Sequence, residues 1–359
     1  MPVDPSLGAL SDQLLTVTVL CYAVAMLCHA VEYAFADRGA GVAAPELVTA
    51  GADSAAADPL APDSLASDSL VPDSLVPDSR TADSVAADSL AAETGADLEP
   101  AGGAVSPGHA LLTGKAGVWL TGLGALAQLG CLTARGLAAD RVPWGNMYEF
   151  TIAVTLVGVV AWLAVAFRFQ VRRLGLFVTL TVVLLLGFAA VRLYTEAGPL
   201  EPALNSYWLK IHVTTAILAT GILMLGFVAA ALFLIRDRYD AVGPTRFPVT
   251  LGAQLPDAAM LERLAFRLHA LAFPIWTFAI MAGAIWAEEA WTRYWGWDPK
   301  EVWAFISWVV YAAYLHARAT AGWRRSTAAW IAVAGWATML INLFVVNLVI
   351  EGLHSYSDA

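Results

Sequence analysis

Long apolar stretches separated by short polar segments make up most of this chain. Each stretch is long enough for an α-helix to cross a hydrocarbon core of about 30 Å, which takes about 17–25 residues. Because a bilayer offers no hydrogen-bond partners, the backbone of such a stretch must satisfy its polar groups within a helix. The pattern predicts an all-α, polytopic integral membrane protein with about eight transmembrane helices. The expected spans are 12–35, 113–137, 148–168, 174–195, 207–235, 266–289, 301–317 and 327–350.

The composition agrees with a membrane protein. Hydrophobic residues make up 59% of the chain and charged residues 14%, against about half and about a quarter in soluble domains. The three cysteines form no CxxC or CxxCH motif, so the chain is not itself a c-type cytochrome. Basic residues do not cluster with aromatic ones in a patch, so no nucleic acid is expected as a partner.

An acidic, repetitive segment interrupts the apolar pattern at residues 37–112. It holds thirteen of the thirty acidic residues, and Asp recurs there at every fifth position, mostly as Asp-Ser. A five-residue period fits neither a helix face nor a strand, so a disordered cytoplasmic loop is expected. A docking or regulatory role stays open, although a tolerated low-complexity expansion is the simpler interpretation. The expected regions are a first transmembrane helix (1–36), this loop (37–112) and a transmembrane core (113–357).

The distribution of basic residues predicts the orientation in the plasma membrane. With the N-terminus outside, fourteen of the twenty Lys and Arg residues fall on the cytoplasmic side, as the positive-inside rule requires. Both termini and the segment 286–308 are then extracytoplasmic. The first span lacks a basic n-region and a clear cleavage site, so it is expected to be a retained helix rather than a signal peptide.

Tryptophan is concentrated in the segment 286–308, around the string WTRYWGWDPKEVW at 291–303. Indole rings with charged residues among them form a flat apolar surface with polar edges, suited to a planar amphipathic ligand. The candidate ligand-binding residues in this segment are Trp291, Trp295, Trp297, Asp298 and Trp303.

Asp298 has two possible roles. It precedes Pro299 at the expected start of a helix, where a carboxylate caps the helix and complements its dipole. The same carboxylate could orient an imidazole or Lys300. A second outer segment, RVPWGNMYEF at 141–150, contains Trp144, which either anchors the chain at the membrane interface or forms a wall of the same pocket.

Histidine is rare, so its expected depth in the membrane is informative. His212 begins the fifth span and His354 follows the eighth, which places both at the outer face. Two imidazoles beside an aromatic surface can supply both axial positions of a haem iron. The alternative for each is an interfacial histidine that contacts lipid headgroups.

Two further histidines are expected at similar depth in the cytoplasmic half. These are His316 in the seventh span and His29 in the first, so a second bis-histidine site is geometrically allowed. His29 could equally be a helix-packing residue. His269 is expected at the cytoplasmic interface, and no role is assigned to it or to His109.

These motifs resemble the CcsA/ResC family of cytochrome c biogenesis proteins, called CcsB in some bacterial lineages, within the haem-handling superfamily named for its WWD domain. The resemblance covers roughly residues 110–357. It implies an external haem b site with His212 and His354 as axial ligands over the WWD aromatic residues. It also implies a membrane haem site at His316, whose second ligand comes from a ResB-like partner. Within this chain, His29 is the alternative second ligand. The motifs that carry the resemblance lie at 143–150, 283–318 and 347–357.

The resemblance implies a subunit of a System II cytochrome c synthase, or haem lyase, that exports haem and presents it for attachment to CxxCH motifs. The implied partners are a ResB-like subunit, apocytochrome c, a thiol-reducing thioredoxin-like protein, haem and membrane lipid. No nucleophile with an adjacent base stands out, so catalysis would be mostly positioning. The alternatives are a haem chaperone without synthase activity, and a transporter or quinone-binding membrane subunit.

Overall fold

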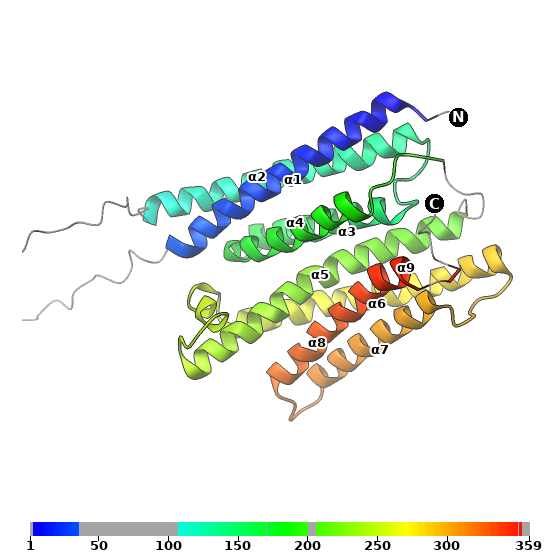
Figure 1. Cartoon of the computed structure of the whole chain (residues 1–359). Coiled ribbons are helices and arrows are strands. Elements are labelled where there is room, and N and C mark those ends of the chain that lie inside the picture. The colour runs from blue at the N-terminus through cyan, green and yellow to red at the C-terminus, as the bar shows by residue number, and fades with distance from the viewer. Residues whose placement is uncertain (1–2, 36–106, 170, 200–205, 351, 354–359) are drawn as a thin grey trace, which may run out of the picture. The chain divides into compact units, whose positions relative to one another are not determined.

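The computed structural model describes residues 3–35, 107–169, 171–199, 206–350 and 352–353. Within these ranges the chain is helical and contains no strand, which confirms the all-α class (Figure 1). Residues 37–106 of the expected acidic loop lie outside the described residues. All described residues belong to one compact unit, made of residues 1–41 and 105–359.

The helices follow the apolar stretches closely. A π-helical turn, η4 (Ile341–Val345), joins α8 to the short α9. Two short 3-10 helices, η1 (Arg172–Leu174) and η3 (Val249–Gln254), lie before α4 and α6. The α-helices are α1 (Pro5–Phe35), α2 (Pro107–Ala138), α3 (Met147–Arg168), α4 (Gly175–Arg192), α5 (Tyr207–Val242), α6 (Ala258–Trp291), α7 (Pro299–Ala319), α8 (Arg325–Leu340) and α9 (Val346–Leu348).

Seven helices in the described residues are long and apolar enough to cross a membrane, one fewer than expected. The exception is α7, which occupies the position of the expected span 301–317. Its 21 residues make it about 32 Å long. Several Trp and Tyr residues, with charged residues at both ends, lower its hydropathy. The length of α7 therefore suits a membrane, although its composition is less apolar than that of the other seven helices.

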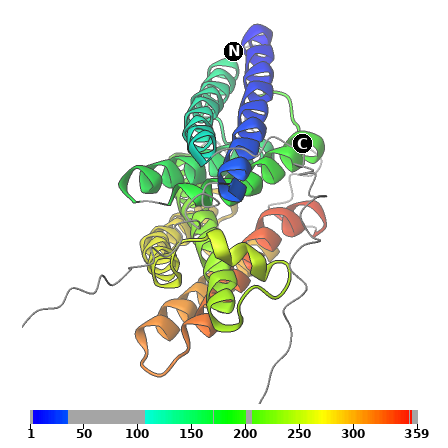
Figure 2. The same ribbon diagram turned by 90° about the vertical axis from the view of Figure 1, so that its left-hand side faces the viewer.

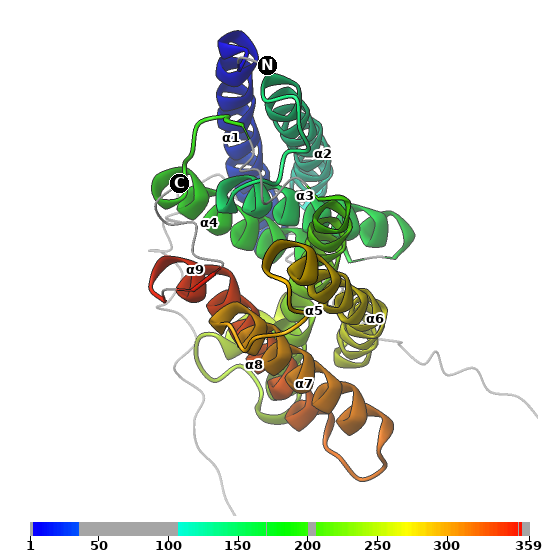
Figure 3. The ribbon, with the colours of Figure 1, turned by 90° about the vertical axis from the view of Figure 1, so that its right-hand side faces the viewer.

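Helix α5 is the central element of the described unit. In its most apolar window 78% of the residues are buried, against 28–44% for the other six candidate spans. It packs mainly against α6, and also against α3 and α8. Figures 2 and 3 show α1 with α2 at one side of these helices and α7 with α8 at the other.

The helix ends collect into two groups. At one end, which we call the tryptophan end, the start of α1 lies with the segments 139–146, 193–199 and 292–298 (Figure 1). The backbone amide of Asp4 donates a hydrogen bond of 3.0 Å to the carbonyl of Ala138 there. The ends of α3, α5 and α7 and the starts of α4, α6 and α8 lie at the opposite end. This grouping is the alternation that successive membrane crossings produce.

Candidate functional site

A cavity of about 180 Å³ lies at the tryptophan end. Helices α3, α5, α6, α7 and α8 contribute to its wall, so residues far apart in the sequence meet there. It brings together three of the predicted site residues, His212, Trp144 and Trp295. Its aromatic and ionisable lining residues are Trp144, Phe150, His212, Trp276, Trp286, Tyr294, Trp295, Lys300 and Glu301.

The imidazole of His212 is held in one orientation by α6. Its Nδ1 lies 2.7 Å from the carbonyl oxygen of Ala279, and its ring is nearly parallel to the indole of Trp286, with centroids 6.3 Å apart. A carbonyl only accepts hydrogen bonds, so Nδ1 carries the proton, and in the neutral form of the ring the lone pair is on Nε2. That arrangement, with the second nitrogen hydrogen-bonded to protein, is the one that metal-ligating histidines use.

Gly283 makes room for this ring. A Cβ added at position 283 would lie 2.7 Å from Cε1 and from Nδ1 of His212. Real Cβ contacts are not that short, so a side chain there would displace the imidazole. The close approach of α6 to His212 therefore depends on glycine at this position.

Asp298 begins α7 and organises the segment before it. Its side chain accepts a hydrogen bond of 3.2 Å from the amide of Lys300. In return, the carboxylate of Glu301 accepts hydrogen bonds from the amides of Gly296 and Asp298, at 2.8 and 3.0 Å. This reciprocal arrangement is a capping box. The helix-capping role considered for Asp298 is therefore what the structure shows.

The same carboxylate also holds the C-terminal segment. Oδ1 of Asp298 accepts a hydrogen bond of 2.8 Å from the amide of Leu353. A Cβ added at Gly352 would lie 2.9 Å from that oxygen, so the two backbones are in close contact. His354 itself lies outside the described residues. Leu353, the residue before it, is hydrogen-bonded to Asp298 in the tryptophan-rich segment.

The remaining predicted tryptophans differ in their distance from the cavity. Trp291 packs edge-on against Trp286, with centroids 4.8 Å apart. Trp297 is 67% exposed and packs edge-on against Trp295. Trp303 lies on α7 and is not part of the cavity wall. An aromatic surface therefore extends from the cavity to the exterior.

Trp276 lines the cavity but could not be recognised as a site residue from the sequence. Trp276 lies inside an apolar stretch, where it looks like an ordinary packing residue. In the described residues its indole Nε1 and that of Trp144 are buried without a hydrogen-bond partner, as are Oδ1 of Asn342 and of Asn347. Buried polar atoms are rarely left unpaired. These four atoms therefore offer hydrogen-bonding positions in the wall of one cavity.

Lys300 adds a titratable cation to the wall. Its Nζ donates a hydrogen bond of 3.3 Å to the carbonyl of Asn342. The residue precedes the expected span 301–317, at the tryptophan end. Burial lowers its pKa to about 7, against the opposing effect of the nearby Asp298 carboxylate. The positive charge of the cavity therefore changes near neutral pH.

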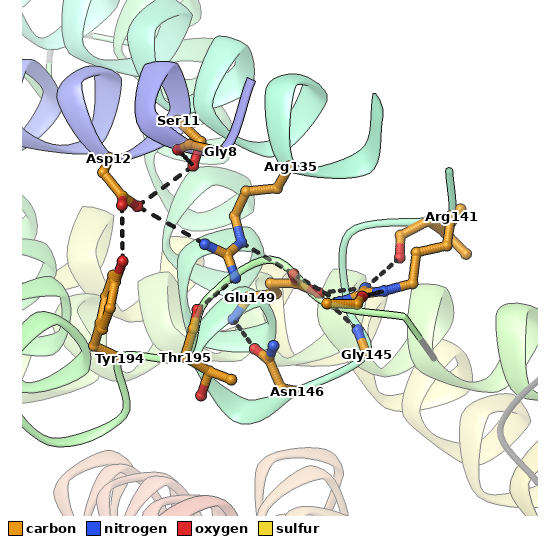
Figure 4. Close-up of polar contacts among 12 residues, drawn as sticks. Gly8, Ser11, Asp12, Arg135, Arg141, Gly145, Asn146, Glu149, Tyr194 and Thr195 are labelled. Carbon is orange, nitrogen blue, oxygen red and sulfur yellow. Dashed lines mark hydrogen bonds and ion pairs between the residues drawn. The ribbon is translucent and has the colours of Figure 1, made fainter. Parts of the chain in front are cut away.

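A buried carboxylate fixes the loop that carries Trp144. Figure 4 shows Glu149 between two guanidinium groups, with Nε of Arg135 at 3.0 Å and Nη1 of Arg141 at 2.7 Å. It also accepts a hydrogen bond from the amide of Gly145, while Asn146 caps α3 by accepting one from the amide of Glu149. These contacts fix the conformation of the segment 141–149 and so position Trp144 in the wall of the cavity.

The structure does not bring His29 and His316 together. His29 is buried, edge-on to Trp162 with centroids 5.4 Å apart, and its Nδ1 lies 3.9 Å from Glu32. His316 is exposed in the last turn of α7. Helices α1 and α7 lie on opposite sides of the described unit in Figure 3. His29 is therefore a buried residue packed between helices, and neither of its ring nitrogens has a hydrogen-bond partner among the described residues.

His269 is more enclosed than its expected interfacial position. It is fully buried, with its ring centroid 5.4 Å from that of Tyr311 and 4.8 Å from that of Tyr314. Its Nδ1 donates to the carbonyl of Ala265 in the same helix. Sequence position alone did not reveal that α7 covers this side of α6.

Comparison with known protein families assigns this chain to one of them. Residues 144–354 match the family described as "Cytochrome C assembly protein". The chain belongs to this cytochrome c assembly family. The matched region begins at Trp144 and ends at His354, so it spans the cavity, the tryptophan-rich segment and all three candidate iron ligands. The resemblance read from the motifs is confirmed.

Individual relatives agree with the family assignment. The chain is 34% identical over 298 residues to the cytochrome c biogenesis protein CcsA of Gloeobacter violaceus, covering 69% of this chain and 86% of the relative. It is 35% identical over 304 residues to CcsA of Microcystis aeruginosa, covering 71% and 90%. For CcsA of Trieres chinensis the identity is 33% over 253 residues, covering 63% and 81%. Since seven helices in its described ranges are able to cross a bilayer, the chain is a multi-pass membrane protein.

Proposed function

We propose that this chain exports haem across the plasma membrane and presents it on the outer face for covalent attachment to apocytochrome c. Haem b is the substrate in this proposal. In the attachment step the S–H bond of each CxxCH cysteine adds across a vinyl C=C bond of haem. The sulfur bonds to one carbon and the hydrogen goes to its neighbour, so there is no leaving group. Family membership and the names of the relatives support the role in cytochrome c assembly.

The geometry of His212 is the strongest support for the proposal that the chain binds haem. The hydrogen bond to Ala279 places the lone pair on Nε2, and the residue lines a cavity with aromatic walls. An imidazole oriented in this way is suited to ligate iron with little loss of conformational freedom. Uncharged indole surfaces around it suit the faces of a macrocycle.

His354 is proposed as the second axial ligand of this outer site. The hydrogen bond from Leu353 to Asp298 supports this assignment, because it ties the chain next to His354 to the start of α7. In this proposal Asp298 acts through the backbone and does not contact the iron. It is a positioning residue.

The cavity alone does not enclose a haem. Its volume of about 180 Å³ is below the about 300–1,000 Å³ of typical small-molecule sites. Trp297, an exposed aromatic residue beside it, and the exposed part of Tyr294 in its wall would supply further contact surface. Lys300 in the wall would pair with a propionate, because it is the basic residue that lines the cavity.

His316 is proposed as a ligand of an inner membrane site that receives haem before export. Its exposure on the surface of α7 supports a site completed by another protein, the ResB-like partner, rather than by His29. A thioredoxin-like protein would keep the apocytochrome thiols reduced. The tryptophan end would face the outside of the cell, in agreement with the distribution of basic residues.

The proposal is tested by expressing the chain with its partner in cells that lack their own cytochrome c assembly system. Covalently bound haem in a reporter cytochrome is measured after denaturing electrophoresis. His212→Ala and His354→Ala are expected to abolish it, and added imidazole to restore part of it by occupying the vacated position. His109→Ala, at an exposed position on α2, is the matched control. Normal maturation in both outer-site variants contradicts the assignment.

The His316→Ala variant tests the inner site separately from the outer site. It is expected to lower the haem content of the purified complex, because haem no longer reaches the outer site. Haem content equal to that of the wild type would remove His316 from the route. If haem binds normally but no thioether forms with the purified components, the chain is a haem chaperone rather than a synthase subunit.

A further inference from the structure

A second cavity lies at the opposite end from the tryptophan-rich segment. Its volume is about 900 Å³, and α1, α2, α3 and η1 contribute to its wall. Four cationic side chains line it against one carboxylate, that of Glu32. The cations are Lys115, Arg168, Arg172 and Arg173.

The carboxylate does not neutralise this cavity. Glu32 pairs with Arg172, whose Nε donates a hydrogen bond of 2.6 Å to it. A Cβ added at Gly114 would overlap the Glu32 carboxylate, so α2 presses directly against this pair. Within the described ranges, Lys115 and Arg168 have neither an ion pair nor a hydrogen bond through their side chains. Two cations therefore remain available to a ligand.

Apolar surface continues from these cations toward the middle of the helices. Trp119 follows Lys115 by one turn of α2, and Leu163 precedes Arg168 by just over one turn of α3. Trp119 is 81% exposed and Phe167 80% exposed, so the cavity opens sideways between α2 and α3. Arg168 ends α3 and Lys115 lies about two turns into α2, while Trp119 and Leu163 lie a further turn or more along these helices.

We propose that this cavity binds an acidic phospholipid. Its phosphate would contact Lys115 and Arg168, while an acyl chain would lie against Trp119 and Phe167. Basic pockets between membrane helices on the cytoplasmic side recognise anionic headgroups in this way. A zwitterionic lipid is disfavoured because its own positive group would lie among four cations. Arg172, already held by Glu32, adds to the positive potential without needing to move.

The test is native mass spectrometry of the full-length chain, purified in detergent, stripped of lipid and then titrated with phosphatidylglycerol or phosphatidylcholine. Wild-type protein is expected to retain phosphatidylglycerol and not phosphatidylcholine. Lys115→Gln combined with Arg168→Gln is expected to weaken retention about thirtyfold, since each cation near an anionic lipid contributes about a fivefold effect.

Two further double variants separate a binding defect from a folding defect. Lys115→Arg with Arg168→Lys preserves both charges and is expected to retain the lipid. Arg238→Gln with Arg263→Gln removes two exposed charges outside the cavity and is expected to have no effect. Each variant is first checked for a single peak in gel filtration.

Three outcomes would overturn the proposal. They are equal retention of the two lipids, unchanged binding in the Lys115→Gln/Arg168→Gln variant, and equal weakening by the control pair. Displacement of the lipid by stoichiometric haem would identify the cavity as a haem site instead. None of these outcomes depends on cytochrome c assembly, so the lipid site and the proposed function can fail separately.

Discussion

Replacing Gly283 by alanine tests the outer site without removing any candidate ligand. The new Cβ would lie 2.7 Å from two ring atoms of His212, whereas carbon atoms pack best at about 3.5–4.0 Å. The imidazole must therefore move by about 0.8 Å or more, which stretches its hydrogen bond to Ala279. Overpacking of this kind costs about 1–3 kcal/mol.

Misplacement of a reacting group by about 1 Å can lower a rate about a hundredfold. We therefore expect Gly283→Ala to reduce the amount of covalent cytochrome c made with the partner by about tenfold to about a hundredfold. The variant should remain folded, because alanine favours a helix. The assay is the quantity of haem-stained reporter cytochrome per unit of membrane-inserted protein.

Gly187→Ala on α4 is the matched control. A Cβ there has no heavy atom within 4 Å, so maturation should stay at the wild-type level. If Gly283→Ala also matures cytochrome c at the wild-type level, the orientation of His212 by α6 is not part of the function. Equal loss in both variants would indicate a general effect of changing glycines in these helices.

Three further predictions concern the groups around the cavity. Asp298→Ala should destabilise the start of α7 by about 1 kcal/mol and release Leu353. A protease should therefore cleave the C-terminus faster than in the wild type. Asp298→Asn, which keeps an acceptor oxygen, should change the cleavage rate less. Glu149→Gln should lower the free energy of unfolding by about 3 kcal/mol, because it leaves buried guanidinium charge uncompensated. The change should appear as a lower unfolding midpoint in detergent. Glu288→Gln, at an exposed position, should leave the midpoint unchanged. Because burial lowers the pKa of Lys300 to about 7, its charge is present below that pH and lost above it. Affinity for a dicarboxylic porphyrin, measured by fluorescence titration, should therefore fall about tenfold from about pH 6 to about pH 8 in the wild type. Lys300→Gln should bind with little pH dependence, and an equal fall in that variant would exclude Lys300 as its source.

The fold was largely predictable because helix length and apolar composition determine a membrane span. The apolar stretches correspond to the helices, including α7 at 299–319. Hydropathy alone gives no information on which helices are neighbours. The central position of α5 and the separation of α1 from α7 come from side-chain packing between distant segments.

The lining of the cavity at the tryptophan end was predictable where rare residue types mark it. His212, Trp144 and Trp295 were all selected from the sequence, and all line the cavity. Trp276 was not selected, because an indole inside an apolar stretch has the same sequence signal whether it packs or lines a site. The depth of His29 and His316 could be compared from their positions in the spans, but not their lateral separation.

If His212 and His354 hold haem at the tryptophan end, the absorption spectrum of the bound haem depends on both histidines. The full-length chain would be purified with its partner and compared with the His212→Ala variant, with and without imidazole, in the reduced state. We expect a spectrum of low-spin, six-coordinate haem in the wild type, its loss in the variant, and its return when imidazole is added. Identical spectra for the two proteins would contradict it.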